Sequence, residues 1–103
     1  MEYPEKEQSF RAEVARSICH AIAIICRIYE EIPLYLEKKG TEYLWKKHYD
    51  ALVYLLYEGR KHKDALLKLA AVSQQRGLRE KAKQLQVTAE KLDAGLKKAA
   101  EVL

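Results

Sequence analysis

Residues 78–103 read LREKAKQLQVTAEKLDAGLKKAAEVL, and the apolar spacing in this stretch decides the fold class. Apolar side chains recur at alternating steps of three and four residues. They form two interleaved sets spaced seven apart: Leu78, Leu85, Leu92 and Ala99, and Ala82, Ala89, Leu96 and Leu103. Such a heptad repeat is typical of a helix that packs along another helix. The partner helix can belong to the same bundle or to another molecule, because the spacing allows both.

The upstream sequence predicts a long first helix over residues 5–31, where apolar residues also recur at three- and four-residue steps. One stripe contains Phe10, Val14, Ile18, Ile22, Ile25, Ile28 or Tyr29, and Ile32, and a second contains Ala15, Cys19, Ala23 and Cys26. A helix that is apolar on two sides is central in its bundle or contacts a second subunit. Proline lacks the amide hydrogen, so we expect Pro33 to kink or break this helix. Gly40 is expected to follow as a left-handed cap.

Two further helices are expected between Gly40 and Leu78. Thr41 is the predicted N-cap of a helix over 42–58, and Gly59 is its predicted end. The stretch GRKHKD at 59–64 would then be a junction before a helix over 61–75, which Arg76 and Gly77 would close. We therefore predict a single domain, residues 1–103, that is an all-α, up-and-down bundle of four main helices, the first one long and kinked near Pro33.

Catalytic and metal-binding patterns are scarce. The three histidines are scattered, and neither His-x-x-x-His nor Cys-x-x-Cys occurs, so we expect no metal and no cofactor. The four glycines do not form a phosphate-binding loop. Arg16 and His20 lie four apart on one helix face, whereas all-helical ribonucleases with an arginine–histidine pair place four to six residues between the two. We predict a non-catalytic protein, with a small helical ribonuclease as the minor alternative.

Positive charge is concentrated in the second half of the chain. Residues 1–58 carry 8 Lys and Arg against 10 Asp and Glu, whereas residues 59–103 carry 11 against 5. This asymmetry permits binding to nucleic-acid phosphates along a basic edge. The candidate residues are Arg60, Lys61, His62, Lys63, Lys68, Arg76, Arg79 and Lys83. Tyr54 and Tyr57 could stack on bases if they are exposed, whereas the plainer interpretation is lysines on solvated helix faces.

Protein assembly is the other predicted activity. The candidate partner interface contains Cys19, Ala23, Cys26, Leu85, Leu92 and Leu96. The two cysteines, seven apart on one helix, are about 10 Å apart and cannot form a disulfide with each other, so we interpret them as small buried apolar residues, with a contact to a symmetry mate as the alternative. The sequence therefore predicts an accessory or adaptor subunit, in a homo-oligomer or a larger complex, that binds protein partners through apolar helix faces and can also bind nucleic-acid phosphates through the basic edge. The alternative is a sequence-nonspecific DNA- or RNA-binding protein in its own right.

The sequence also carries expectations about the environment of the protein. The N-terminus is acidic and polar, unlike a signal peptide, and the longest uncharged run is the ten residues from Ser17 to Cys26. A membrane span needs about 20 residues, so we expect a soluble, cytoplasmic protein. Asparagine is absent while Lys and Glu are abundant, which favours a protein adapted to heat.

Overall fold

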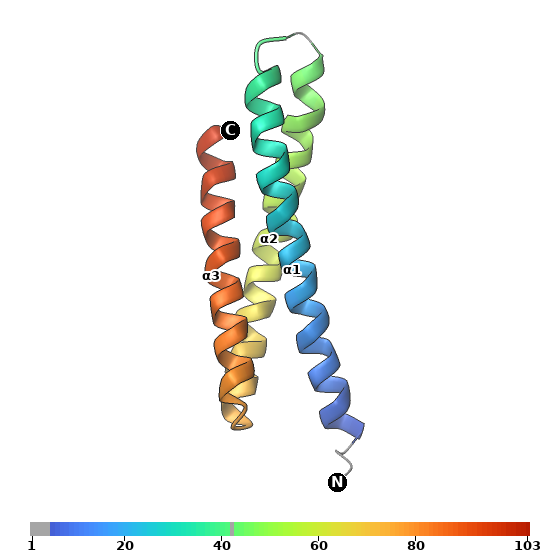
Figure 1. The fold of residues 1–103 in the computed structure, drawn as a ribbon, viewed down its shortest axis with the longest axis vertical. Helices are drawn as coiled ribbons and strands as arrows, with labels where there is room; N and C mark the ends of the chain where they lie inside the picture. Colours follow the sequence, from blue (N-terminus) through green and yellow to red (C-terminus); the bar gives the residue numbers. More distant parts are fainter. Residues whose placement is uncertain (1–4, 42) are drawn as a thin grey trace.

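The computed structural model describes residues 5–41 and 43–103, with side chains from Gln8 onward, and the described chain is all-helical. It contains three helices, α1 (Glu5–Lys38), α2 (Leu44–Gln75) and α3 (Arg79–Val102), each antiparallel to the one before it (Figure 1). They form a rod with extents of 60 × 20 × 16 Å. The predicted all-α class is confirmed. The predicted number of four main helices is wrong, because two of the expected helices are one.

The fused helix is α2, which runs without interruption through Gly59 and the GRKHKD stretch. Gly59 is buried, and a Cβ at this position would lie 2.5 Å from Cδ2 of Leu96. The glycine therefore allows α2 and α3 to approach closely, and it does not end a helix. A glycine inside a helix costs only about 1 kcal/mol relative to alanine, which the packing of the two helices readily offsets.

Pro33 does not break the first helix either. The α1 helix continues through this exposed proline for a further turn and more, to Lys38. Ile28 before the proline and Tyr35 after it are both buried in the core. Packing on both sides therefore holds the helix together despite the hydrogen bond that proline removes. The kink that we predicted at Pro33 stays a prediction.

Both turns depend on a glycine with positive φ, as the sequence predicts: Gly40 at +94° and Gly77 at +77°. After α2, the amide of Leu78 donates to the carbonyl of Ser73 (2.8 Å) and the amide of Gly77 to that of Gln74 (3.1 Å). This pair of bonds is a Schellman motif. The predicted role of Thr41 is wrong, because its hydroxyl donates to the carbonyl of Lys38 (2.6 Å) and so satisfies the end of α1. Tyr43 is the N-cap of α2.

The heptad seam of α3 packs inside the chain's own bundle. Leu85, Leu92 and Ala99 have no exposed surface, and Ala82, Ala89 and Leu96 are buried beside them. The alanines of the seam let α1 and α2 come close to α3. The seam meets side chains from both other helices, chiefly Val14, Ala21 and Ile28 of α1 and Leu52, Leu55 and Leu66 of α2.

The third helix is shorter than the other two, so α1 and α2 extend past its C-terminus as a two-helix hairpin (Figure 1). Aromatic rings fill the space between them: the Tyr35 and Tyr49 centroids are 6.1 Å apart, and the Trp45 and Tyr49 centroids 5.7 Å. Nδ1 of His48 lies 2.7 Å from Oε2 of Glu31. These contacts hold the hairpin together without α3.

Candidate protein-docking face

The outer face of α1 carries a second heptad that α2 and α3 leave largely exposed, although Tyr29 lies beside Gly95 and Lys98 of α3. Its members alternate in steps of three and four residues, and every one is uncharged and exposed. We call this set the outer stripe: Ala12, Ala15, Cys19, Ile22, Cys26, Tyr29, Pro33 and Leu36. At 1.5 Å per residue it is about 36 Å long. A solvated helix face normally carries charged residues at such positions, so this pattern is typical of a helix that packs on two sides.

The inner face of α1 has the same seven-residue period. Val14, Ala21, Ile28 and Tyr35 lie seven apart, and all four are buried against α2 and α3. On the outer stripe, in contrast, Ile22 is 48% exposed, Tyr29 45% and Leu36 50%. The helix is therefore built with two seams, and the fold uses one of them.

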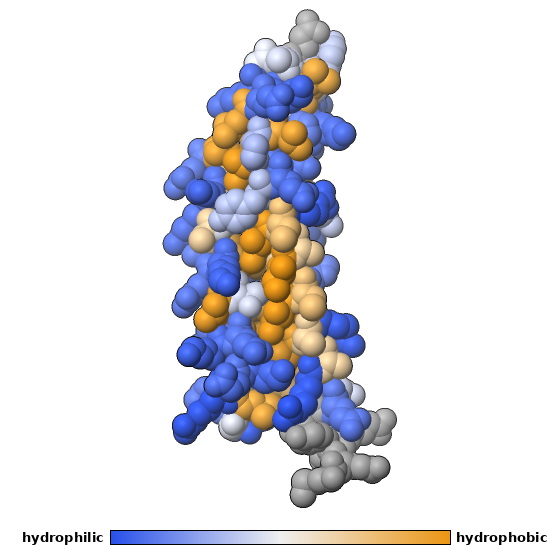
Figure 2. All heavy atoms as spheres, in the orientation of Figure 1, coloured by the Kyte–Doolittle hydropathy of each residue, from blue (hydrophilic) through white to orange (hydrophobic). Residues whose placement is uncertain are grey.

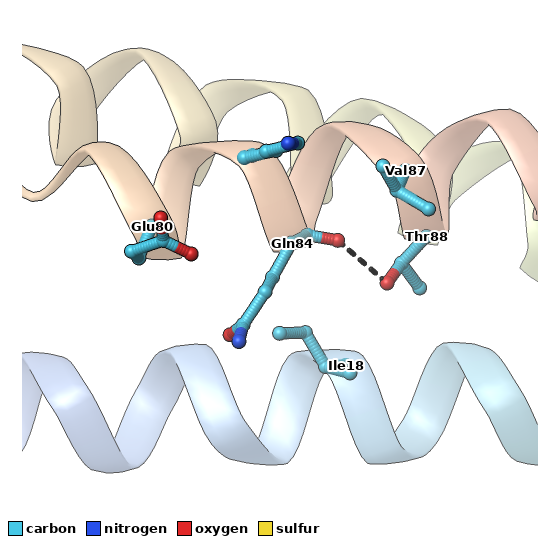
Figure 3. Close-up of a pocket in the computed structure, with 6 residues that line it drawn as sticks. Ile18, Glu80, Gln84, Val87 and Thr88 are labelled. Atoms are coloured by element: carbon cyan, nitrogen blue, oxygen red, sulfur yellow. Dashed lines mark hydrogen bonds between the residues drawn. The ribbon is translucent and has the colours of Figure 1, made fainter.

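The outer stripe continues on one side into a groove between α1 and α3. Figure 2 shows an apolar band along the middle of the face on which α1 and α3 lie in front of α2. The groove has a volume of about 510 Å³, and Ile18 faces Glu80, Gln84, Val87 and Thr88 across it (Figure 3). The hydroxyl of Thr88, a residue that lines the groove, donates to the carbonyl of Gln84 (2.7 Å) and is thereby satisfied within α3.

Charged side chains border the outer stripe on its other side. The flanking positions, also seven apart, hold Arg16, Ala23, Glu30 and Glu37, and all four are exposed. Within the residues that the structure describes, neither Arg16 nor Glu30 forms an ion pair. The outer stripe thus has a cation near one end, acids near the other and a small residue between them.

The structure divides the predicted partner interface into two groups. Cys19, Ala23 and Cys26 are exposed and lie on the outer stripe or beside it. Both cysteines are free thiols, and because they are exposed, their interpretation as buried residues is wrong. Leu85, Leu92 and Leu96 belong to the core and present no surface to a partner. The sequence signal for this face was the second stripe of the first helix, with Ala15, Cys19, Ala23 and Cys26. Ile22 and Tyr29, which the sequence placed in the first stripe, are exposed and lie on the outer stripe instead.

The basic cluster at 60–63 is distributed around α2 instead of forming one surface. Successive helical residues point about 100° apart, and these four lie inside a continuous helix. Nζ of Lys61 lies 5.0 Å from the Tyr57 ring centroid and 3.9 Å from Oε1 of Glu58. Lys63 turns the other way, with Nζ 3.1 Å from Oδ1 of Asp93 on α3. Hydrogen bonds from Lys63 and Lys97 keep the pKa of Asp93 below its usual range.

The remaining members of the predicted basic edge also differ in their surroundings. The guanidinium of Arg76 lies 4.2 Å from the ring centroid of Phe10 on α1. Arg60, Lys68, Arg79 and Lys83 are exposed, with Lys83 at the groove between α1 and α3. Half of the eight residues therefore make internal contacts, which reduces the charge available to a phosphate backbone.

Two histidines that the sequence analysis did not pair lie together where α1 meets α2. The ring centroids of His20 and His62 are 4.1 Å apart, and Nε2 of His62 lies 4.0 Å from Oε2 of Glu58. Burial, and then the charge of His20, lower the pKa of His62. His20 also lines a pocket of about 200 Å³, together with Arg27 and Tyr54. The contact between His20 and His62 could have been predicted only if residues 44–75 had been taken as one helix antiparallel to α1. The sequence analysis instead expected a helix end at Gly59.

The comparisons with known proteins leave the site to be interpreted from its geometry alone. Neither protein-family models, nor curated proteins, nor solved structures give a match to this chain. Among the described residues, no three His, Cys, Asp or Glu side chains gather in a metal-binding arrangement. None of the helices within 5–41 and 43–103 has the length and apolar character that a membrane crossing requires.

Proposed function

We propose that this protein is a non-catalytic assembly subunit that binds a protein helix along the outer stripe of α1. The observation that carries the proposal is the exposed, uncharged heptad from Ala12 to Leu36, on the opposite side of the helix from a complete core seam. Heptads of this kind pack against helices, because each apolar side chain inserts between four side chains of its neighbour.

The composition of the outer stripe supports close packing of a partner helix. Ala12, Ala15, Cys19 and Cys26 are small, so a second helix can approach along most of the length. Ile22, Tyr29 and Leu36 are the large side chains that such a helix would remove from water. Apolar area buried in this way contributes about 25 cal/mol per Å², and large contiguous exposed apolar patches commonly mark a protein-binding site.

Ile22→Glu is the direct test, because it places a charge at the centre of the outer stripe without touching the core. The matched control is Leu67→Glu on α2, whose 45% exposure is close to the 48% of Ile22. We expect Ile22→Glu to abolish association in light scattering and in pull-down from the native source, and the control to retain it. Circular dichroism should show equal helix content in both variants. Association that survives Ile22→Glu unchanged would contradict the proposal.

Nucleic-acid binding on α2 is the second candidate, and one observation favours it. Tyr54 and Tyr57 are 57% and 61% exposed, and Tyr57 lines a surface hollow of about 430 Å³ with Arg60 and Lys61. Exposed aromatic rings beside cations are suited to stacking on single-stranded bases. Fluorescence anisotropy with a labelled single-stranded RNA should then show binding that falls steeply with salt and is lost in Tyr57→Ala with Arg60→Glu. Unchanged binding by this double variant would remove the candidate.

A further inference from the structure

We infer that the helix bound by the outer stripe is α1 of a second copy of this chain, running antiparallel. This inference rests on the proposed function and names the partner. It is drawn from the pattern of size and charge along the exposed face of α1. The pattern is complementary to itself when it is reversed end to end, as an isologous two-fold interface requires.

Side-chain size matches in this arrangement. The two-fold axis crosses α1 at the level of residue 24 along the helix. Each layer of the interface then joins one residue from one half of the outer stripe to one residue from the opposite half of the partner subunit's outer stripe. Ala12 meets Leu36 of the partner subunit, and Cys19 meets Tyr29 of the partner subunit. Ile22 in turn meets Cys26 of the partner subunit, and Ala15 meets Pro33 of the partner subunit. Each of the three bulky side chains therefore faces a small one, so the helices pack without a clash or a void.

Charge matches in the same register. On the flank of the outer stripe, Arg16 of each copy lies across from Glu30 of the partner subunit, and the two-fold axis creates this pair twice. Ala23 lies beside its own symmetry mate between the two pairs, where its small side chain leaves room. Arg16 and Glu30 have no ion-pair partner within the described chain, so both are available for this contact. Opposite charges at such flanking positions set the orientation of paired helices.

The opposite flank argues for the same orientation. It holds Ile18, Ile25 and Ile32, which are partly buried against the core. In the antiparallel register Ile25 lies beside its own symmetry mate and Ile18 beside Ile32 of the partner subunit. In a parallel pair, Glu30 would instead face Ile25 of the partner subunit, and Glu37 would face Ile32 of the partner subunit. Acids placed against isoleucines would lose hydration without gaining a cation, so the parallel arrangement is disfavoured.

The test is a charge reversal read out as molar mass. Sedimentation equilibrium and light scattering on the purified full chain should give twice the chain mass of 11.9 kDa. Arg16→Glu or Glu30→Arg alone should raise the dimer dissociation constant by about tenfold, because two exposed ion pairs become like-charge contacts. The double variant Arg16→Glu with Glu30→Arg should restore the dissociation constant of the native chain. Lys68→Glu, on α2 away from the outer stripe, should leave it unchanged.

The outcomes separate this inference from the proposed function. A dimer that is weakened by each reversal and restored by both supports the antiparallel pair. A dimer that depends on Ile22 but ignores the charge reversals overturns this orientation while the docking face stands. A chain that stays at 11.9 kDa at all concentrations overturns self-pairing, and Ile22-dependent binding to another protein would then leave the proposed function intact. A dimer indifferent to Ile22→Glu would overturn both.

Discussion

Two heptads of this protein, one on α3 and one on the outer face of α1, have the same spacing and opposite surroundings. The α3 seam is closed, since Leu85, Leu92 and Ala99 have no exposed surface. The outer stripe of α1 is open, with Ile22, Tyr29 and Leu36 about half exposed. The difference teaches that a heptad indicates a neighbouring helix without saying which molecule supplies it. Within residues 5–41 and 43–103, α3 takes part in one of these two packing faces, and no fourth helix covers the other.

The largest expected effect comes from truncating one large residue in each heptad. Leu92→Ala should lower the free energy of unfolding by about 2–5 kcal/mol, because it leaves a cavity in the core. Ile22→Ala should cost less than about 1 kcal/mol in dilute solution, where the outer stripe is uncovered. Urea unfolding at submicromolar concentration, followed by the fluorescence of Trp45, the single tryptophan of the chain, measures both. Similar losses in the two variants would contradict the distinction between a closed and an open seam.

Two glycines sharpen the comparison through the packing of α3. A Cβ at Gly59 would lie 2.5 Å from Cδ2 of the buried Leu96, so overpacking in Gly59→Ala should outweigh the gain in helix propensity and lower the free energy of unfolding by about 1–2 kcal/mol. A Cβ at Gly95 would meet Tyr29 at 3.7 Å, an ordinary contact, so Gly95→Ala should gain about 0.5–1 kcal/mol from helix propensity. Thermal unfolding of the two variants should therefore shift in opposite directions. A shared direction would mean that the helix spacing at one of these glycines differs from the one described.

The smallest effect is a pH dependence that belongs to the internal contacts and not to the outer stripe. Burial, and then the charge of His20, lower the pKa of His62 below its ordinary value of about 6.5, although Glu58 acts in the opposite direction. The folded protein therefore takes up this proton less readily than the unfolded chain. The contribution of His62 to the free energy of unfolding is therefore complete above pH 6.5 and is lost as the pH falls below that value.

Urea unfolding at pH 7.5 and pH 5.5 measures this loss. Replacing the imidazole in His62→Gln should reduce the difference between the two values, since the glutamine does not titrate. An equal difference in the native chain and the variant would assign the pH dependence to other groups.

The sequence was sufficient for the parts of the fold that depend on local spacing. The helical class, the heptad of α3 and the glycine turns at Gly40 and Gly77 all follow from periodicity and backbone freedom, whereas only the structure shows that the α3 heptad packs inside the bundle. The fused α2 helix did not follow, because a glycine that ends a helix and a glycine under a leucine of another helix look alike in sequence. Only the position of Leu96 across from Gly59 distinguishes them.

The candidate site was predicted in part. The second apolar stripe of α1 indicated a partner surface, and three of the six predicted interface residues lie on or beside the outer stripe. The predicted basic edge was weakened by tertiary contacts that no local pattern reveals, such as Lys63 with Asp93 and Arg76 with Phe10. The pairing of His20 with His62 required the register of α1 against α2, which emerges only from the packed structure.

The most direct test of the central claim is the rate at which a maleimide labels Cys19 and Cys26. Both thiols lie on the outer stripe and are free and exposed in the single chain. We expect slow labelling of the native protein at tens of micromolar, faster labelling on dilution, and fast labelling at every concentration in Ile22→Glu. Equally fast labelling of the native protein and the variant, independent of concentration, would show that no second copy of the chain covers the outer stripe.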